Sequence, residues 1–285
     1  MRIIKVAATQ MSCSWNLDKN IDKAESMVKK AADKGANIVL LQELFETPYF
    51  CQRQDFNYYS LATDIDSNRA IQHFMTIARE YEVVLPISFF EKAGNTTFNS
   101  IVVIDADGTV LGTYRKTHIP DGLPYAEKFY FTPGDTGFKV WNTKYGKIGV
   151  GICWDQWFPE AARAMALLGA EILLYPTAIG NEPILEYDSM PQWRRCMQGH
   201  AAANIMPVVA SNRVGTERDE TEMTFYGSSF IADETGEIIQ EMDRKKEDII
   251  VAEFDLDKIA QRRRNWGVFR DRRPEMYNIL MTHGR

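Results

Sequence analysis

Two patterns of apolar residues alternate along this chain. Residues 16–36 place Ile21, Ala24 and Val28 three or four positions apart, with polar residues between them, which is typical of an amphipathic helix. Residues 37–44 instead form an almost unbroken apolar run, which is typical of a strand covered on both faces. This alternation predicts a protein in which strands and helices follow one another.

The same two patterns recur through the whole sequence and predict its secondary structure. Strands are expected over residues 3–10, 37–44, 83–91, 99–108, 110–118, 147–153, 171–178, 207–214, 226–233, 237–242 and 248–254. Helices are expected over residues 16–36, 67–81, 159–169, 191–205 and 255–266. Ser67 and Asp255 are predicted N-caps, and Asp-Ala-Asp-Gly at 105–108 predicts a hairpin turn.

The order of these elements indicates one α/β domain. It begins as βαβαβ, continues through adjacent strands and returns to βαβαβ, and no Pro/Gly/Ser linker or low-complexity segment interrupts it. We therefore expect residues 1–285 to form a single domain with mixed sheets and outer helices. Two sheets packed face to face would explain why many strands are apolar on both faces, although the pattern alone leaves one sheet possible.

Composition narrows the class of protein. The 285 residues are 45% hydrophobic and 25% charged, which is ordinary for a globular protein. A formal net charge of -6 argues against a nucleic-acid partner or an anionic membrane surface. The N-terminal apolar stretch is broken by Lys5, and no apolar run approaches the ~20 residues that cross a bilayer. A cytoplasmic protein is the expectation.

Cysteine and histidine usage disfavours disulfides and metal sites. The four cysteines are scattered, no C-x-x-C pair occurs, and the four histidines lack zinc-type spacing. We expect reduced thiols, no metal and no cofactor.

The segment KIGVGICWDQWFPEAAR, residues 147–163, combines features of a nucleophile turn. Its apolar residues alternate with glycines, so one strand face is bare and open to close approach by a backbone or ligand. Cys153 ends this strand, and Pro159 opens the next helix, whose N-terminus is expected to lower the pKa of the thiol. Position alone leaves two interpretations of Cys153 open, a nucleophile at a strand-to-helix elbow or a small buried hydrophobe. Asp155 and Arg163 are expected to pair structurally near this turn.

A nucleophilic thiol needs a base, and the sequence offers more than one. His118 and His200 are possible partners. Glu43, in LLQELF, and Lys116, in YRKTHIP, stand at the ends of otherwise apolar strands, where active sites of α/β proteins collect. Spacing does not choose between a Cys–His pair and a site built from these two charges, which also form a plausible structural ion pair.

Taken together, the stretches around Glu43, Lys116 and Cys153 resemble the carbon–nitrogen hydrolase (nitrilase) family, and the resemblance covers nearly the whole chain. It implies a four-layer αββα sandwich of two mixed sheets and hydrolysis of nitriles, amides or carbamoyl groups by a Glu-Lys-Cys triad without a metal. Glu43 is then the expected base for Cys153. The resemblance also implies a second acid, Glu127 in GLPYAEKFYFTPGD, whose alternative is a surface pair with Lys128.

Other stretches resemble one branch of that family: YPTAIGNEP, QWRRCMQGHAAAN, VASNRVG and NWGVFRDRRPEMY. This branch acts on small cationic carbamoyl amines. A site for such a substrate needs a carboxylate for the ammonium and aromatic or apolar walls. Glu182 is the candidate carboxylate, although a solvated loop acid explains it equally well. The candidate wall residues are Trp154, Tyr49, Tyr130 and Tyr187.

Two further functions remain as alternatives. The first is an amidase of the same family that acts on another carbamoyl amine, a carbamoyl amino acid, an ω-amide or a nitrile. The second is a non-enzymatic interaction protein on this fold. A pocket that ends in an acid favours a cationic substrate, and an intact triad favours an enzyme.

The C-terminal segment 262–285 is basic and aromatic in an otherwise acidic chain. Interleaved acids disfavour nucleic acid as its partner. We expect an arm used in contacts within a homodimer or larger homo-oligomer, in which Trp266, Phe269 and Tyr277 are buried against a neighbouring copy.

Overall fold

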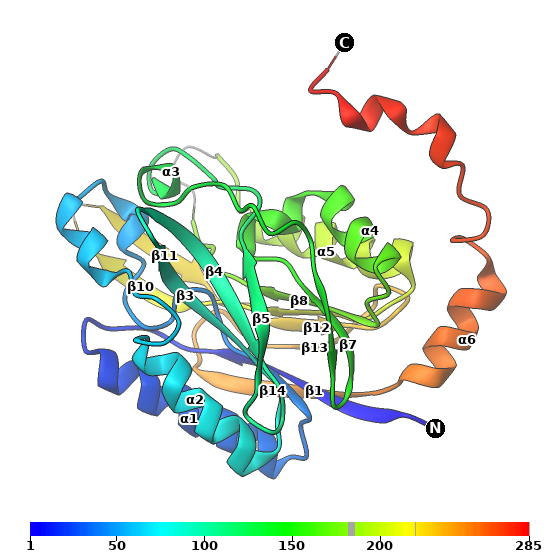
Figure 1. Cartoon of the computed structure of the whole chain (residues 1–285), viewed down its shortest axis with the longest axis horizontal. Coiled ribbons are helices and arrows are strands. Elements are labelled where there is room, and N and C mark those ends of the chain that lie inside the picture. Colours follow the sequence, from blue (N-terminus) through cyan, green and yellow to red (C-terminus); the bar gives the residue numbers. More distant parts are fainter. Residues whose placement is uncertain (182–185, 220, 285) are drawn as a thin grey trace.

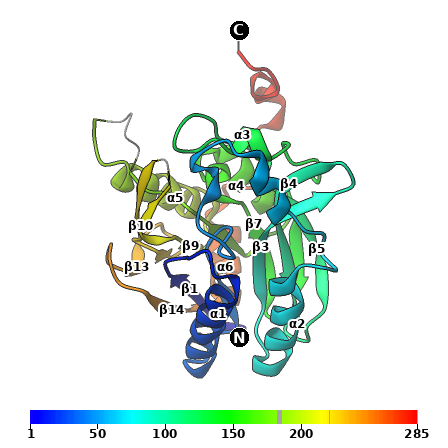
Figure 2. The ribbon, with the colours of Figure 1, turned by 90° about the vertical axis from the view of Figure 1, so that its left-hand side faces the viewer.

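Most strands lie in two layers in the computed structural model, which describes residues 1–181, 186–219 and 221–284 (Figures 1 and 2). In the first layer β14, β1 and β2 are adjacent in that order, as are β3, β4 and β5, and hydrogen bonds of Val84 with Asn37 and Val39 join the two groups. These strands are β1 (Ile3–Gln10), β2 (Ile38–Leu40), β3 (Leu85–Ala93), β4 (Thr96–Ile104), β5 (Val110–Arg115) and β14 (Asp248–Asp255). β1 and β2 are parallel, whereas β14, β4 and β5 pair antiparallel to their neighbours.

The second layer has the order β13-β12-β9-β8-β7-β6. Its strands are β6 (Val140–Thr143), β7 (Gly146–Val150), β8 (Ile172–Pro176), β9 (Val208–Ser211), β12 (Phe230–Ala232) and β13 (Ile238–Glu241). β7, β8 and β9 are parallel, so their carboxyl ends share one edge of the sheet. The hairpin of β10 (Val214–Arg218) and β11 (Glu222–Tyr226) stands apart from both layers.

Period-two alternation explains the unbroken apolar runs. Ile38 and Leu40 of β2 face the core between the sheets, whereas Val39 faces the outer helices. In β8, Leu174 faces the core between the two sheets, whereas Leu173 faces the helices that cover the second sheet. A strand with helices on one side and a sheet on the other must be apolar on both faces.

Helices cover the outer faces of both sheets (Figure 2). α1 (Leu17–Asp33) and α2 (Arg69–Tyr81) pack on the first sheet, and α4 (Pro159–Leu167) and α5 (Met190–Asn204) pack on the second. The predicted αββα sandwich of two mixed sheets is confirmed. The other α-helices of the described residues are α3 (Glu127–Tyr130) and α6 (Leu256–Trp266), and short 3₁₀ segments lie between elements and after α6.

The main differences from the expected elements lie where strands stop. The strand predicted over 37–44 ends at Leu40, and the chain then turns, with Leu44 at φ +48°. The strand predicted over 207–214 ends at Ser211, and β10 begins after a break at Asn212 and Arg213. β6, α3 and the β10–β11 hairpin were not predicted.

The predicted helix caps fared differently. Asp255 is confirmed as the N-cap of α6, because its side chain accepts the N–H groups of Asp257 and Lys258. Ser67 is not the cap of α2. Asn68 takes that place, with its side chain accepting from Ile71 N, and the Ser67 hydroxyl instead donates to Asp64.

The C-terminal segment leaves the body of the molecule after α6 (Figure 1). Gly267 ends the helix at φ +79°, and residues 273–284 are exposed. Trp266 is 71% exposed, but Phe269 is partly buried against its own chain. The guanidinium of Arg163 lies over the Phe269 ring. Phe269 is thus only partly covered by its own chain, and its burial against a neighbouring copy stays a prediction. No helix in the described ranges is long and apolar enough to span a bilayer.

Candidate active site

The turn after β7 holds Cys153 in strained backbone. Cys153 has φ +41° and begins a 3₁₀ segment, Cys153–Trp157. Non-glycine residues adopt this region only where neighbouring contacts enforce it. Asp155 supplies those contacts, because its N–H donates to Ile152 O and its carboxylate accepts Ile152 N–H at 3.0 Å. The elbow predicted from the sequence is therefore present.

The bare face of β7 has a different use from the one expected. A Cβ placed on Gly151 would lie 2.8 Å from the ring of Tyr175, and one on Gly149 would lie 3.0 Å from Leu173 and Met165. The glycines therefore make room for side chains of β8 and α4, not for a ligand.

Asp155 does not pair with Arg163. Its carboxylate accepts the Tyr114 hydroxyl at 2.7 Å and both the N–H and the ring Nδ1 of His118, at 3.0 and 2.7 Å. Arg163 instead donates to Ala203 O and covers the ring of Phe269. A completely buried carboxylate needs several donors, and Tyr114 and His118 supply them to Asp155.

Both histidines considered as bases are held by other partners. The ring of His118 stacks on Phe158 at 3.6 Å and contacts Asp155 through Nδ1. The ring of His200 lies 2.7 Å from the carbonyl of Gln156. The Cys–His alternative therefore lacks support for Cys153.

Three buried charges come together from separate elements. Lys116, just after β5, donates to Glu43 Oε1 at 2.8 Å and to Glu127 Oε2 at 2.6 Å. Glu43 lies beyond the end of β2, and Glu127 begins α3. All three side chains are completely buried, so each charge depends on the others for its stability.

The two carboxylate oxygens of Glu43 have different surroundings. Oε1 accepts Lys116 and also the Asn99 side-chain amide at 2.7 Å. Oε2 is buried and has no hydrogen-bond partner within the described residues. One oxygen is thus fixed while the other is available to take up a proton, as a general base requires.

Burial and the acids raise the pKa of the Cys153 thiol well above its usual value. Cys153 is 4% exposed, and burial is the largest cause, followed by the charge of Glu43, while Lys116 acts in the opposite direction. The prediction of a lowered thiol pKa is wrong for the resting protein, because desolvation of the thiolate outweighs the helix terminus. The three charges are near enough to act on the thiol, which stays protonated at neutral pH.

The charges in the cluster also shift each other's pKa. Burial by itself lowers the pKa of Lys116, but the charges of Glu127 and Glu43 reverse that effect and hold it well above its usual value. Burial raises the pKa of Glu127, and Lys116 opposes this. The ammonium therefore remains charged throughout the neutral range.

The predicted wall residues lie in different places. Tyr49 belongs to the buried cluster, because its hydroxyl donates to Glu127 Oε1 at 2.6 Å. Trp154 follows Cys153 and is half-buried, with its ring edge-on to that of Trp157. The hydroxyl of Tyr130 is directed to the backbone of residues 53–55.

Two candidates for substrate contacts remain, Tyr187 and Glu182. Tyr187 is 58% exposed and donates to the Gln192 side chain. Glu182 lies outside the described residues.

Two contributors to the cluster were not found from the sequence. Asn99 begins the strand predicted over residues 99–108, where a polar residue resembles an ordinary solvent-facing position, and it lies inside β4. Gly134, in the TPGD sequence, accommodates the backbone that holds Lys116, since its N–H donates to Lys116 O and a Cβ there would lie 2.1 Å from Arg115 O.

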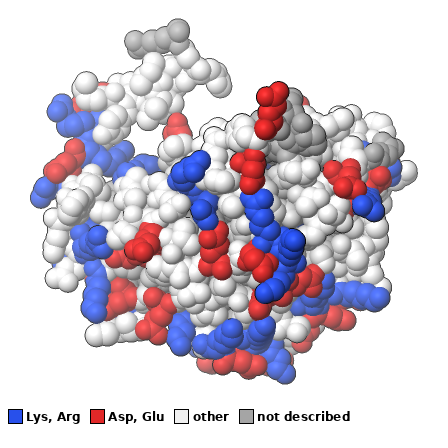
Figure 3. Space-filling view, turned by 180° about the vertical axis from the view of Figure 1, so that it is seen from behind, with Lys and Arg blue, Asp and Glu red and all other residues white. Residues whose placement is uncertain are grey.

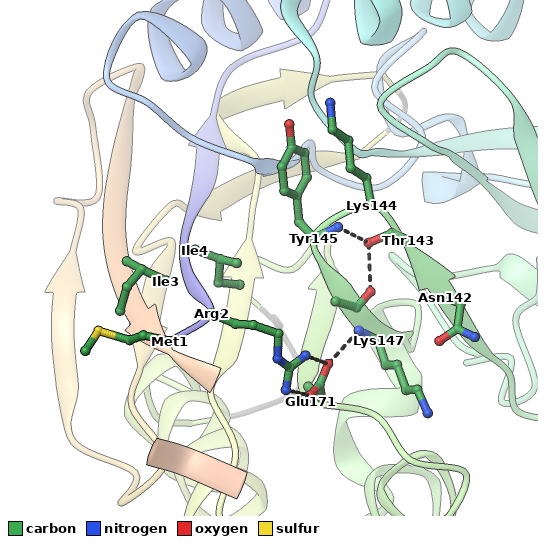
Figure 4. Close-up of a pocket in the computed structure, with 11 residues that line it drawn as sticks. Met1, Arg2, Ile3, Ile4, Asn142, Thr143, Lys144, Tyr145, Lys147 and Glu171 are labelled. Carbon is green, nitrogen blue, oxygen red and sulfur yellow. Dashed lines mark hydrogen bonds and ion pairs between the residues drawn. The ribbon is translucent and has the colours of Figure 1, made fainter. Parts of the chain in front are cut away.

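A surface pocket of about 570 Å³ lies elsewhere (Figure 4). It is lined by residues 1–4 and by the β6–β7 hairpin, at the opposite end of β7 from Cys153. Arg2 and Glu171 close one side with an ion pair. None of the candidate catalytic residues lines it, so this pocket has no part in the site.

Charges of both signs are interspersed on the face opposite to that of Figure 1 (Figure 3). That face carries no continuous basic surface of the kind that binds nucleic acid. Within the described ranges, no three His, Cys, Asp or Glu side chains are grouped to hold a metal ion. The expected absence of metal, cofactor and nucleic-acid partners remains a prediction.

Comparison with known proteins agrees with this geometry. A profile of the family described as carbon-nitrogen hydrolase matches residues 5–264. The chain belongs to the carbon-nitrogen hydrolase family. It is therefore a hydrolase of carbon–nitrogen bonds other than peptide bonds, and the resemblance inferred from its motifs is confirmed.

Individual relatives of this carbon-nitrogen hydrolase cover nearly its whole length. It is 58% identical to an N-carbamoylputrescine amidase of Oryza sativa subsp. japonica, over 98% of this chain and 95% of that protein. It is 57% identical to a citrullinase of Francisella tularensis, over 99% of both chains. The crystal structure of a carbon-nitrogen hydrolase from Helicobacter pylori G27 matches with a TM-score of 0.92 and 41% identity, covering 99% of this chain and 100% of that one.

Proposed function

We propose that this enzyme hydrolyses N-carbamoylputrescine to putrescine, carbon dioxide and ammonia, with Cys153 as nucleophile and Glu43 as general base. The observation that carries the chemistry is the Lys116 ammonium between two buried carboxylates, one of which has an oxygen without a partner in the described structure. The substrate is supported by relatives more than half identical that bear this amidase name.

The first half of the reaction forms a bond from sulfur to carbon. Glu43 Oε2 takes the thiol proton, and the sulfur of Cys153 attacks the carbamoyl carbon. The carbonyl electron pair moves onto oxygen. The Lys116 ammonium stabilises that charge together with the Trp154 N–H, which as one of the first N–H groups of a helix has no intrahelical acceptor. Each such donor contributes about 3 kcal/mol to lowering the barrier.

The second half releases the products. Glu43 returns its proton to the departing nitrogen, the carbon–nitrogen bond breaks, and an acyl-thioester remains on Cys153. Water, oriented by Glu43 and Glu127, then attacks the acyl carbon, and the thiol leaves. The carbamic acid that forms loses carbon dioxide to give the remaining amine, so one water is consumed for each substrate.

Recognition of the substrate's ammonium needs a separate group. We assign it to Glu182, with Trp154, Tyr49, Tyr130 and Tyr187 as candidates for the walls around the four-carbon chain. Tyr49 has the strongest support, because its hydroxyl contacts Glu127. A carboxylate that accepts the substrate's ammonium favours a cationic amine over a substrate that ends in an acid.

Citrulline hydrolysis is the second candidate, because a citrullinase is almost as similar to this chain as the plant amidase. Citrulline carries the same ureido group and terminal ammonium but adds a carboxylate beside that ammonium. A pocket that accepts it needs a cation or N–H donors at that position.

A substrate panel decides between these candidates. Ammonia release is measured with N-carbamoylputrescine, citrulline, carbamoyl amino acids without an amine, ω-amides and nitriles, with Cys153→Ala as the blank. We expect kcat/KM to be highest for N-carbamoylputrescine, and Glu182→Gln to raise its KM at unchanged kcat. A higher kcat/KM for citrulline would favour the second candidate, and an unchanged KM would exclude Glu182 as the ammonium site.

We also propose that residues 262–285 form an arm in a homo-oligomer. Trp266, Leu280 and Met281 are well exposed on a segment that leaves the body, which favours burial against another copy. Removal of residues 268–285 should reduce the sedimentation coefficient at equal protein concentration. An unchanged assembly in the truncated protein would refute the arm.

A further inference from the structure

A buried ion pair that takes no part in the proposed reaction lies beside the cluster. Arg213 stands between β9 and β10 and is completely buried, and its Nη1 donates to Glu217 Oε1 at 2.8 Å. Glu217, on β10, is 9% exposed. Two charges removed from water are costly unless the surrounding groups make full use of them. The contacts of their remaining atoms therefore indicate what the pair does.

The second nitrogen of Arg213 reaches the general base's main chain. Its Nη2 donates to the carbonyls of Glu43, at 3.2 Å, and of Leu44. Leu44 has φ +48°, a conformation that persists only where other contacts impose it. The Leu44 N–H donates to the Ser88 hydroxyl at 3.0 Å on the other side. Arg213 therefore holds the turn that directs Glu43 toward Lys116.

The second oxygen of Glu217 reaches the other carboxylate through Tyr49. Glu217 Oε2 accepts the Tyr49 backbone N–H at 2.6 Å, and the Tyr49 hydroxyl donates to Glu127 at 2.6 Å. Glu127 is joined to Glu43 through Lys116, so the contacts form a closed ring. Within this ring, the ion pair links the main chain at Glu43 and Leu44 to the main chain at Tyr49.

We propose that the Arg213–Glu217 pair is a positioning device that fixes Glu43 and Glu127 relative to each other through the Glu43–Leu44 turn and through Tyr49. This role rests on the proposed function of the two carboxylates. It assigns no contact with the substrate to either residue. A displacement of about 1 Å at a catalytic group is enough to lower a rate by about a hundredfold, so such a device affects turnover more than binding.

The variant Glu217→Gln tests this with little change in volume. Its amide presents a donor where one of the two acceptor oxygens stood, so it keeps either the Arg213 contact or the Tyr49 contact but not both. Glu217 borders a cavity of about 260 Å³, which leaves room for the side chain to adjust. Glu222→Gln is the matched control, because Glu222 makes the same i,i+4 ion pair with Arg218 on this hairpin but is 57% exposed.

For Glu217→Gln we expect kcat to fall about 10- to 100-fold with KM changed less than about threefold. The acidic limb of the kcat/KM profile should move about half a pH unit or more toward alkaline pH, because the Tyr49 hydroxyl favours ionised Glu127. Within the described residues, Lys116, Glu43, Tyr49 and the Cys51 and Cys153 thiols are the titratable groups that act on or face Glu127. Glu222→Gln should match wild type in both measurements.

A double-mutant cycle with Tyr49→Phe separates the possible outcomes. We expect Tyr49→Phe to shift the acidic limb by itself and Glu217→Gln to add no further shift in that background. Folded Glu217→Gln enzyme with wild-type kcat and pH profile would overturn the positioning role, as would fully additive shifts. If Glu127→Gln and Tyr49→Phe both leave turnover unchanged, the proposed function of Glu127 fails instead. Arg213→Lys retains the positive charge but not the two guanidinium nitrogens that donate to separate acceptors. Its kcat should lie between those of wild type and Glu217→Gln.

Discussion

The two sheets contribute to the site in different ways. The first sheet supplies charges, with Glu43 after β2 and Lys116 after β5, and each is held by side-chain hydrogen bonds from other elements. The second sheet supplies the thiol of Cys153 after β7, and backbone conformation holds it, with φ +41° enforced by Asp155. A buried charge is stable only with a partner of opposite charge, whereas a neutral thiol needs only a backbone that holds it in position.

This difference predicts where the site is fragile. In the charged half, loss of one partner leaves another ion buried and unpaired. In the thiol half, loss of the Cys153 sulfur should remove activity without lowering stability. Loss of the hydrogen bonds from Asp155 that support the turn should lower both.

The largest effect is expected for Lys116→Met. It leaves Glu43 and Glu127 buried without their shared cation, which should lower the free energy of unfolding by about 3–5 kcal/mol and abolish turnover. Burial already raises the pKa of Glu127, so without Lys116 its folded form binds a proton more readily than the unfolded chain. The loss of stability should therefore grow as pH rises above the ordinary glutamate pKa. Urea unfolding across pH measures this.

The matched test for Lys116→Met adds Glu127→Gln to remove one of the two uncompensated acids. Stability at pH 8 should recover in part while turnover stays absent. No recovery would show that the ammonium's packing, not its charge, supports the cluster.

Asp155→Ala should have the next largest effect, because it removes the acceptor for Ile152, Tyr114 and His118 in the thiol half. Leaving buried donors unpaired costs about 1–3 kcal/mol each before relaxation, so we expect a loss of about 3 kcal/mol. Asp107→Ala, in the exposed hairpin turn after β4, serves as control and should lower stability much less. Equal losses from thermal unfolding would show that Asp155 does not support the elbow.

Glu46→Gln tests an acid near the charged half for which the described residues show no cation partner. Burial raises the pKa of Glu46 to about 7, although Asn68 and the Ala70 N–H lower it. The folded state thus keeps the proton while the unfolded chain releases it, and stability falls as pH rises from about 4.5 to 7. The variant should be up to about 3 kcal/mol more stable at pH 8 and unchanged near pH 4. A pH-independent difference would contradict this.

The smallest effect concerns the resting thiol. Because burial and Glu43 raise its pKa, alkylation of Cys153 by a small reagent should be slow at pH 7 and accelerate up to and beyond pH 9. Peptide mass spectrometry after timed quenching gives the rate at each pH. A plateau already reached near pH 7 would show that the free enzyme holds a thiolate.

The fold was predictable because the patterns of apolar and polar residues typical of strands and helices recur along the chain. Buried strands such as 37–44 and helices such as 16–36 carry periodic patterns long enough to recognise, and Glu43 and Lys116 stand out as charges at the ends of apolar runs. α3 spans four residues, Glu127–Tyr130, too few for a period to show, so Glu127 depended on resemblance alone.

Other parts of the site depend on tertiary contacts that the sequence does not show. Asn99 and Arg213 lie in strand-like segments, where their polar side chains look solvent-facing. The partners of Asp155 come from residues about forty positions earlier, and a charged neighbour on the next helix was the natural but wrong choice. The thiol pKa depends on desolvation, which only the packed structure reveals.

The most direct test of the Glu43–Cys153 mechanism is to trap the acyl enzyme. Glu43→Gln protein, which cannot activate the water that hydrolyses the acyl enzyme, is mixed with N-carbamoylputrescine at high pH, acid-quenched and digested. The account predicts that the peptide containing Cys153 gains the mass of one acyl group, which also identifies the nitrogen that leaves first, and that Cys153→Ala gains none. Turnover at the wild-type rate in Glu43→Gln, or a stable adduct on Cys13, Cys51 or Cys196 instead, would contradict it.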